Sequence, residues 1–202
     1  MSKHTLKKSF ESGDLNGFQV GGRCHVSVSI PTPNGTLKAR SGLFFAVIDD
    51  PSMANQDGVR LPGPPPVLKT RNYRKTGTDG LMTIGVNGAM LALNHVQVAK
   101  NATIRFWWAF IGKDKREGCN DFALFEIVDE DNNILHRRWL CETRFSLFES
   151  WTVFQHVNDF EGTVNLRWVS SNGRTAIDED EVEQAFHRTY PCTLLLDAIE
   201  II

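Results

Sequence analysis

The chain has 202 residues, of which 41% are hydrophobic and 23% are charged, as in an ordinary globular protein. This length suits one large all-β domain, so we expect residues 1–202 to form a single domain. The formal charge of −2 argues against a general affinity for nucleic acid or for anionic membranes.

Targeting signals and cysteines add few constraints. Residues 1–8 hold no apolar run of the kind that a secretion signal needs, and no segment is apolar for long enough to cross a bilayer. As written, the chain is therefore expected in the cytoplasm, or outside the cell or in a virion by another route. Its cysteines (Cys24, Cys119, Cys141 and Cys192) include no C-x-x-C pair. Two disulfides could form, but without a leader we expect free and mostly buried thiols.

The first part of the chain predicts strands followed by a long loop. Cys24 to Ile30 alternates apolar and polar residues, which is typical of a strand with one solvent-exposed face. Residues 43–48 are continuously apolar and indicate a buried strand. Residues 49–80 are rich in Pro and Gly, and Pro cannot donate a hydrogen bond to a sheet. We therefore expect a long loop over 49–80, with one short strand near residues 67–69.

The second part of the chain predicts a series of short strands. We expect a hairpin turn at Asn87-Gly88, a second hairpin at the polar run 129–133, and one short helix over 178–188. The expected strands cover residues 81–86, 89–93, 103–111, 122–128, 134–140, 151–157, 163–169 and 193–201. This pattern predicts an all-β fold, namely an antiparallel jelly-roll β-sandwich with one short helical insertion near the C-terminus.

Alternation within the strands separates core aromatic residues from surface ones. Phe106, Trp108 and Phe110 share one face of the strand at 103–111, and Trp107 lies on the other. Trp168 is in phase with the apolar residues of its own strand. We therefore expect Phe106, Trp108, Phe110 and Trp168 in the core.

Four short motifs, spread over both ends and the middle of the chain, resemble one family. They are SFESGDLNGF at residues 9–18, AKNATIRFWWAF at 99–110, NDFAL at 120–124 and LLDAI at 195–199. They resemble the galactose-binding-like jelly-roll domains of carbohydrate-binding modules and of related bacterial surface proteins. The chain departs from that pattern at Phe18, where a Trp is usual, and in its long loop.

The resemblance implies a structural calcium ion where the first segment meets the last strand. Glu11 and Asp197 would be its ligands, with Asp14 as a further candidate. Ca²⁺ binds carboxylate and carbonyl oxygens, so these residue types suit it. Such an ion would tie the two ends of the chain together. The alternative is that Glu11 caps a turn and that Asp197 has a protein partner.

Aromatic side chains beside planar polar ones are typical of a glycan site, because sugars stack on aromatic rings while polar groups bind their hydroxyls. Tyr73 lies in the long loop near Arg71, and Trp139 follows Arg137 on the strand face opposite the core. We therefore name Tyr73, Arg71, Trp139 and Arg137 as candidate ligand-binding residues. The alternative for each aromatic is packing under a loop or over the second face of the sandwich.

The motif search favours binding over catalysis. No nucleophile elbow, zinc-protease, P-loop or dinucleotide motif is present. The basic stretch Arg71 to Lys75 would suit nucleic acid, but it is short and the whole chain is slightly acidic. Our leading hypothesis is a non-catalytic carbohydrate-binding or adhesion-type module that binds a glycan. One alternative is a structural subunit of a virion, tail or surface layer that binds other proteins. Another is a glycan-active enzyme on a jelly roll.

Overall fold

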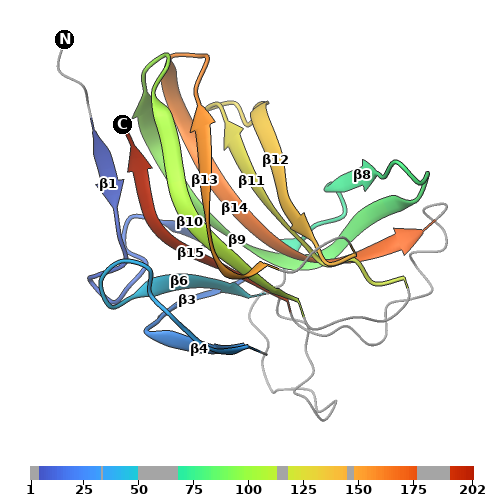
Figure 1. Cartoon of the computed structure of the whole chain (residues 1–202). Helices are drawn as coiled ribbons and strands as arrows, with labels where there is room; N and C mark the ends of the chain where they lie inside the picture. Colours follow the sequence, from blue (N-terminus) through green and yellow to red (C-terminus); the bar gives the residue numbers. More distant parts are fainter. Residues whose placement is uncertain (1–4, 33, 50–67, 113–117, 145–147, 177–191) are drawn as a thin grey trace.

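The computed structural model describes residues 5–32, 34–49, 68–112, 118–144, 148–176 and 192–202. In these ranges all strand pairing is antiparallel, and two large sheets pack face to face (Figure 1). The predicted antiparallel β-sandwich is thereby confirmed. The predicted helix over 178–188 and the loop residues 50–67 lie outside the described residues. None of the described segments is a helix that could cross a membrane.

The strands form two large sheets and one small hairpin. Sheet A has the order β13-β10-β15-β6-β3, with β1 beside β15, and sheet B has the order β12-β11-β14-β9-β2, with β7 and β8 also beside β9. The strands of sheet A are β1 (Leu6–Lys8), β3 (Arg23–Ser27), β6 (Phe45–Asp49), β10 (Thr103–Gly112), β13 (Phe148–Val157) and β15 (Cys192–Ile201). The strands of sheet B are β2 (Gln19–Gly21), β7 (Leu68–Lys69), β8 (Arg74–Thr76), β9 (Met82–Val98), β11 (Phe122–Val128), β12 (Ile134–Glu142) and β14 (Gly162–Ala176). The hairpin pairs β4 (Ser29–Thr32) with β5 (Gly35–Lys38).

The main core lies between the two sheets and is built from alternate residues of their strands. Phe106 lies 4.9 Å from Phe125 and 5.4 Å from Trp168, measured between ring centroids. Burial of each such ring contributes about 2–3 kcal/mol. The four predicted core aromatics (Phe106, Trp108, Phe110 and Trp168) all belong to this core, as the alternation predicted.

The turn predicted at Asn87-Gly88 is wrong, because β9 runs unbroken from Met82 to Val98. In the pairing with β14, Asn87 faces Asn172 and Gly88 faces Ser171. A Cβ atom on Gly88 would overlap the carbonyl oxygen of Ser170 and lie 3.0 Å from the Thr70 methyl group. Glycine at this position therefore permits close packing on a continuous strand, which is its other common role within sheets.

Three other predicted features are confirmed. The hairpin around residues 129–133 is the antiparallel pair β11–β12. The short strand expected near residues 67–69 is β7, and the loop contains a second short strand, β8. The four cysteines are thiols rather than disulfides, and three of them (Cys119, Cys141 and Cys192) are buried, as expected.

Two histidines pack together where the edge strands of the two sheets meet. His136 on β12 and His156 on β13 stack with their ring centroids 4.0 Å apart. Burial lowers the pKa of His136, and the charges of His156 and Arg138 lower it further, whereas Asp159 opposes the shift. Burial likewise lowers the pKa of His156, again opposed by Asp159. We infer that both rings are neutral at pH 7 and that this neutral pair joins the two edge strands.

Candidate functional site

One segment of the long loop folds onto the outer face of sheet B. We call residues 68–76 the crossing segment. Its two strands, β7 and β8, pair with β9 on the edge that β2 also joins, opposite β14, and the turn between them lies against the sheet. There the Thr70 hydroxyl lies 2.6 Å from the Ser171 hydroxyl of β14, and the amide of Gly85 donates to the Tyr73 carbonyl at 2.9 Å.

Glycine in β9 allows the crossing segment to lie this close. A Cβ atom on Gly85 would overlap the Thr70 carbonyl oxygen and would lie only 2.8 Å from the Thr70 hydroxyl. No larger residue fits unless the crossing segment moves away from the sheet. Gly85 therefore brings the loop and Tyr73 into contact with the sheet.

The outer face of sheet B carries a second, smaller apolar cluster. Tyr73 is only 6% exposed and packs on three buried residues of β11 and β14 (Phe122, Leu124 and Val169), with Met90 and Trp139 at the margin. The rings of Phe122 and Trp139 lie 4.3 Å apart. Trp139 remains partly exposed. We call these six residues the outer-face cluster.

Glu126 joins Tyr73 and Arg137 into a fixed group that we call the clasp. The Tyr73 hydroxyl donates to Glu126 Oε2 at 3.3 Å, and Arg137 Nε donates to Oε1 at 2.6 Å. The Arg137 guanidinium also lies 5.2 Å from the centre of the Tyr73 ring. Burial, together with the charge and hydrogen bond of Glu126, raises the pKa of Tyr73 to about 12. Tyr73 is therefore a neutral donor at any physiological pH.

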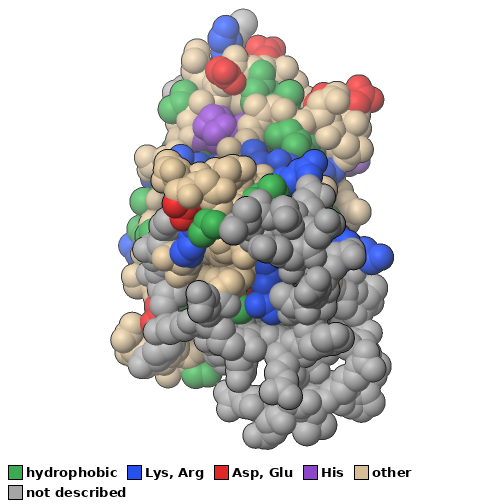
Figure 2. All heavy atoms as spheres, turned by 90° about the vertical axis from the view of Figure 1, so that its right-hand side faces the viewer, with side chains coloured by type: hydrophobic (Ala, Val, Ile, Leu, Met, Phe, Trp, Pro, Cys, Tyr) green, Lys and Arg blue, Asp and Glu red, His purple; other side chains and the backbone are tan. Residues whose placement is uncertain are grey.

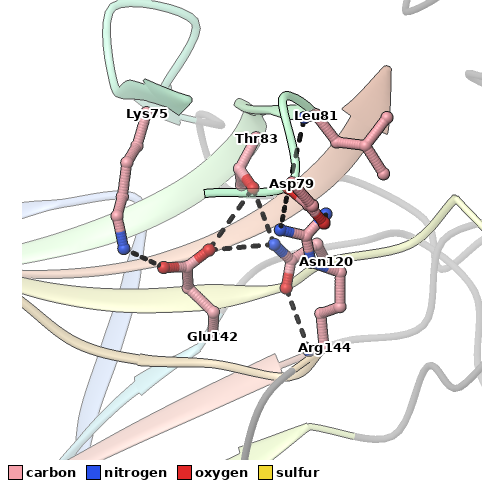
Figure 3. A network of polar contacts seen from close by, with 7 residues as sticks. All are labelled: Lys75, Asp79, Leu81, Thr83, Asn120, Glu142 and Arg144. Carbon is pink, nitrogen blue, oxygen red and sulfur yellow. Dashed lines mark hydrogen bonds and ion pairs between the residues drawn. The ribbon is translucent and has the colours of Figure 1, made fainter. Parts of the chain in front are cut away.

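A polar network adjoins the cluster at the end of β12 (Figure 3). Glu142 accepts hydrogen bonds from Lys75 at 2.5 Å, from the Asn120 amide at 3.1 Å and from the Thr83 hydroxyl at 3.4 Å. Lys75 comes from β8, and its ammonium group also lies 5.5 Å from the centre of the Trp139 ring. The network therefore fixes one more cation beside the partly exposed tryptophan.

The structure brings together three of the four predicted ligand-binding residues. Tyr73, Trp139 and Arg137 meet on the outer face of sheet B, and Arg71 lies exposed in the turn of the crossing segment. The ring of Tyr73 is covered, so Tyr73 supports the face rather than offering a surface for stacking. Sequence reasoning missed Glu126, although a carboxylate inside the apolar strand FALFEIV was the available signal, because a buried charge needs a partner.

The predicted calcium ligands Glu11 and Asp197 both bind the loop of residues 40–44. Asp197 Oδ2 accepts the amides of Arg40 at 2.8 Å and Ser41 at 2.9 Å. Glu11 accepts the amide of Leu43 at 3.0 Å, and that of Phe44 at 3.2 Å. Burial raises the pKa of Asp197, as does the charge of Glu11, while the amide hydrogen bonds oppose the shift.

As arranged, these residues do not fit a calcium ion. Asp14 binds Ser12 and Asn16 in its own turn and does not join the other two acids. Nowhere in the described part of the chain do three or more His, Cys, Asp or Glu side chains form a group that could hold a metal. Calcium takes roughly six to eight oxygen ligands, whereas here backbone amides occupy both carboxylates. Calcium at this loop stays a prediction.

A groove of about 530 Å³ lies between β1 and β9. Its lining includes Lys8, Leu93, Asn94, His95 and Gln97 and contains no Trp, Tyr or Phe. Since sugars stack on aromatic rings, the groove suits a glycan less well than the outer face of sheet B does.

Comparison with known proteins gives likeness in structure but not in sequence. No protein-family model and no curated protein matches the chain. A structure of carbohydrate-binding modules from the β-sandwich superfamily, described as promiscuous in specificity, is 13% identical with a TM-score of 0.49. This chain covers 60% of that structure's length and 96% of its own.

Two further solved structures match over most of both chains. The K1 cleaved adhesin domain of Lys-gingipain from Porphyromonas gingivalis W83 is 13% identical, with a TM-score of 0.48 and 98% of each chain covered. The xylan-binding CBM22-1 domain of Paenibacillus barcinonensis Xyn10C is 15% identical, with a TM-score of 0.42, 97% of this chain and 91% of that one covered. Likeness at this level does not carry an inference about function.

Proposed function

We propose that the chain is a non-catalytic binding module for a carbohydrate, and that the carbohydrate binds on the outer face of sheet B beside Trp139. The observation that carries the proposal is a partly exposed tryptophan ring packed on Phe122 and flanked by the fixed cations Lys75 and Arg137. A sugar ring stacks on the aromatic surface, and the two cationic side chains donate hydrogen bonds to its hydroxyls.

The clasp supports this proposal because it orders the site before a ligand arrives. Arg137 is held by Glu126 and packs against Tyr73, and Lys75 is held by Glu142. Side chains that are already ordered lose little conformational entropy on binding, so more of the interaction energy appears as affinity. A rigid sheet with a bound loop is the kind of scaffold on which binding residues commonly lie.

A glycan array tests the proposal, with Trp139→Ala as the site variant and Trp107→Ala as its matched control. Trp107 is also partly exposed, but it lies on the outer face of sheet A against Arg40, at 4.5 Å. We expect selective glycan binding that Trp139→Ala weakens by tenfold or more and Trp107→Ala leaves intact. Equal binding by both variants would move the site elsewhere, and a blank array would overturn the carbohydrate proposal.

A structural or assembly role is the second candidate, and exposed apolar residues on the edge strands favour it. Ile134 and Leu135 on β12 are 48% and 44% exposed, and Val153 and Val157 on β13 are 41% and 62% exposed. Exposed apolar edge strands are surfaces on which other chains can pair. Sedimentation analysis separates the two functions, because an assembly subunit oligomerises whereas a binding module stays monomeric.

A further inference from the structure

The charges that surround Trp139 are positive at the surface and negative beneath it. Lys75 and Arg137 have side chains that are 42% and 27% exposed, whereas the side chains of their partners Glu142 and Glu126 are only 6% and 2% exposed. A ligand on this face therefore meets the cations first. The acids below hold the cations in place and reduce their charge only in part.

A third cation extends this positive surface across the sheet. The register places Glu126 directly opposite Arg137 on β12 and opposite Arg167 on β14, so one acidic residue lies between two arginines across the sheet. Arg167 donates to the side-chain oxygen of Asn132, which is neutral. Arg137 and Arg167 lie on β12 and β14, which are separated by β11, so their backbones are roughly 10 Å apart. A single glycan chain can therefore contact both.

The crossing segment carries two further exposed arginines, Arg71 and Arg74. Figure 2 views the molecule from the side on which β8 lies, and Lys and Arg side chains form a band across the middle of that view. Asp and Glu side chains lie mostly toward the upper end of the same face. The chain as a whole carries a formal charge of −2, so this band of described cations does not follow from the overall charge.

We propose that the carbohydrate bound beside Trp139 is anionic and carries carboxylate or sulfate groups; this inference rests on the proposed function. Arg137 and Arg167 bind the anionic groups, because guanidinium groups form paired hydrogen bonds with planar or tetrahedral oxyanions. Trp139 stacks on a sugar ring between them. A neutral glycan would leave Arg137 and Arg167 with one carboxylate between them, whereas an anionic glycan supplies the second negative charge.

Matched polymers that differ only in charge test the inference. Polygalacturonate is compared with its fully methyl-esterified form, and dextran sulfate with dextran, by biolayer interferometry at low and high NaCl. We expect each charged polymer that binds to do so at least tenfold more tightly than its neutral counterpart, with the preference falling as salt rises. The comparison of polygalacturonate with its ester tests for a preference for carboxylate groups, and the comparison of dextran sulfate with dextran tests for a preference for sulfate groups.

Two charge variants locate the effect. Arg167→Gln should weaken binding of the charged polymer several-fold and leave the thermal melt unchanged. Lys7→Gln, which removes a cation on β1 with a side chain that is 70% exposed, should leave binding unchanged. Equal loss in the two variants, or charged-polymer binding that survives both Arg167→Gln and Trp139→Ala, would show non-specific adsorption and overturn the inference.

The same experiment distinguishes failure of the inference from failure of the proposed function. If the neutral polymers bind as well as the charged ones and Trp139→Ala abolishes binding, the carbohydrate site stands and its anionic specificity is refuted. If the wild type binds neither these polymers nor any glycan on the array, both proposals fall.

Discussion

Removal of the Glu126 carboxylate tests whether the clasp holds the outer face of sheet B together. In Glu126→Ala the Arg137 guanidinium loses its only described ion-pair partner, and the Tyr73 hydroxyl loses its acceptor. Loss of one member of a buried ion pair costs about 3–5 kcal/mol. Arg137 keeps partial access to water, which reduces that cost, whereas the Tyr73 hydroxyl adds about 1 kcal/mol. We expect a loss of about 3 kcal/mol of unfolding free energy in total.

The assay is urea unfolding followed by tryptophan fluorescence. We expect a lower midpoint with an unchanged denaturant slope, which marks a change in stability rather than in compactness. Glu126→Gln keeps the shape and one acceptor and should lose about 1–2 kcal/mol. Glu130→Ala is the matched control, because the Glu130 side chain is 63% exposed at the hairpin tip. It should change stability by about 0.5 kcal/mol or less.

A double-mutant cycle with Arg137→Met isolates the pair. Since the two side chains are in contact, we expect a coupling energy of about 1 kcal/mol or more. The reasoning is refuted if Glu126→Ala costs less than about 1 kcal/mol, or if the two substitutions are additive. Either result would mean that apolar packing alone holds the crossing segment and Arg137 in place.

Three further predictions concern other parts of the molecule. Gly85→Ala should lower the free energy of unfolding in urea by about 1–3 kcal/mol, because the new Cβ atom displaces Thr70. Wild-type stability in this variant would show that the crossing segment does not contact β9 at Gly85. Both stacked histidines have lowered pKa values, so their contribution to the free energy of unfolding is complete above the ordinary pKa of about 6.5 and is lost as the pH falls below it. The free energy of unfolding should therefore drop as the pH falls below about 6.5. This drop should be shallower in His156→Phe but unchanged in the control His25→Phe. A calcium ion at the 40–44 loop predicts that EDTA lowers the melting temperature of the wild type but not of Asp197→Asn, and an unchanged wild-type melt would remove the ion.

Much of the fold follows from local features of the sequence. Phe106, Trp108 and Phe110 alternate with other residues along one strand, and side chains in a strand point to opposite faces in turn, so their common burial follows from spacing alone. The hairpin around residues 129–133 is likewise local, because Asp129 accepts hydrogen bonds from the backbone amides of its own turn. The four motifs led to the same sandwich.

The candidate site depends instead on contacts between residues far apart in the chain. Tyr73 and Glu126 are separated by 53 positions, and Lys75 and Glu142 by 67, so no local pattern pairs them. The same limit explains the error at Asn87-Gly88, a dipeptide that forms a tight turn in isolation but lies within a continuous strand here. Alternation along each strand determined which residues face the core, because it is a property of the backbone. Only the tertiary structure decided which loop covers the outer face of sheet B, because that depends on how closely Gly85 and Thr70 can approach.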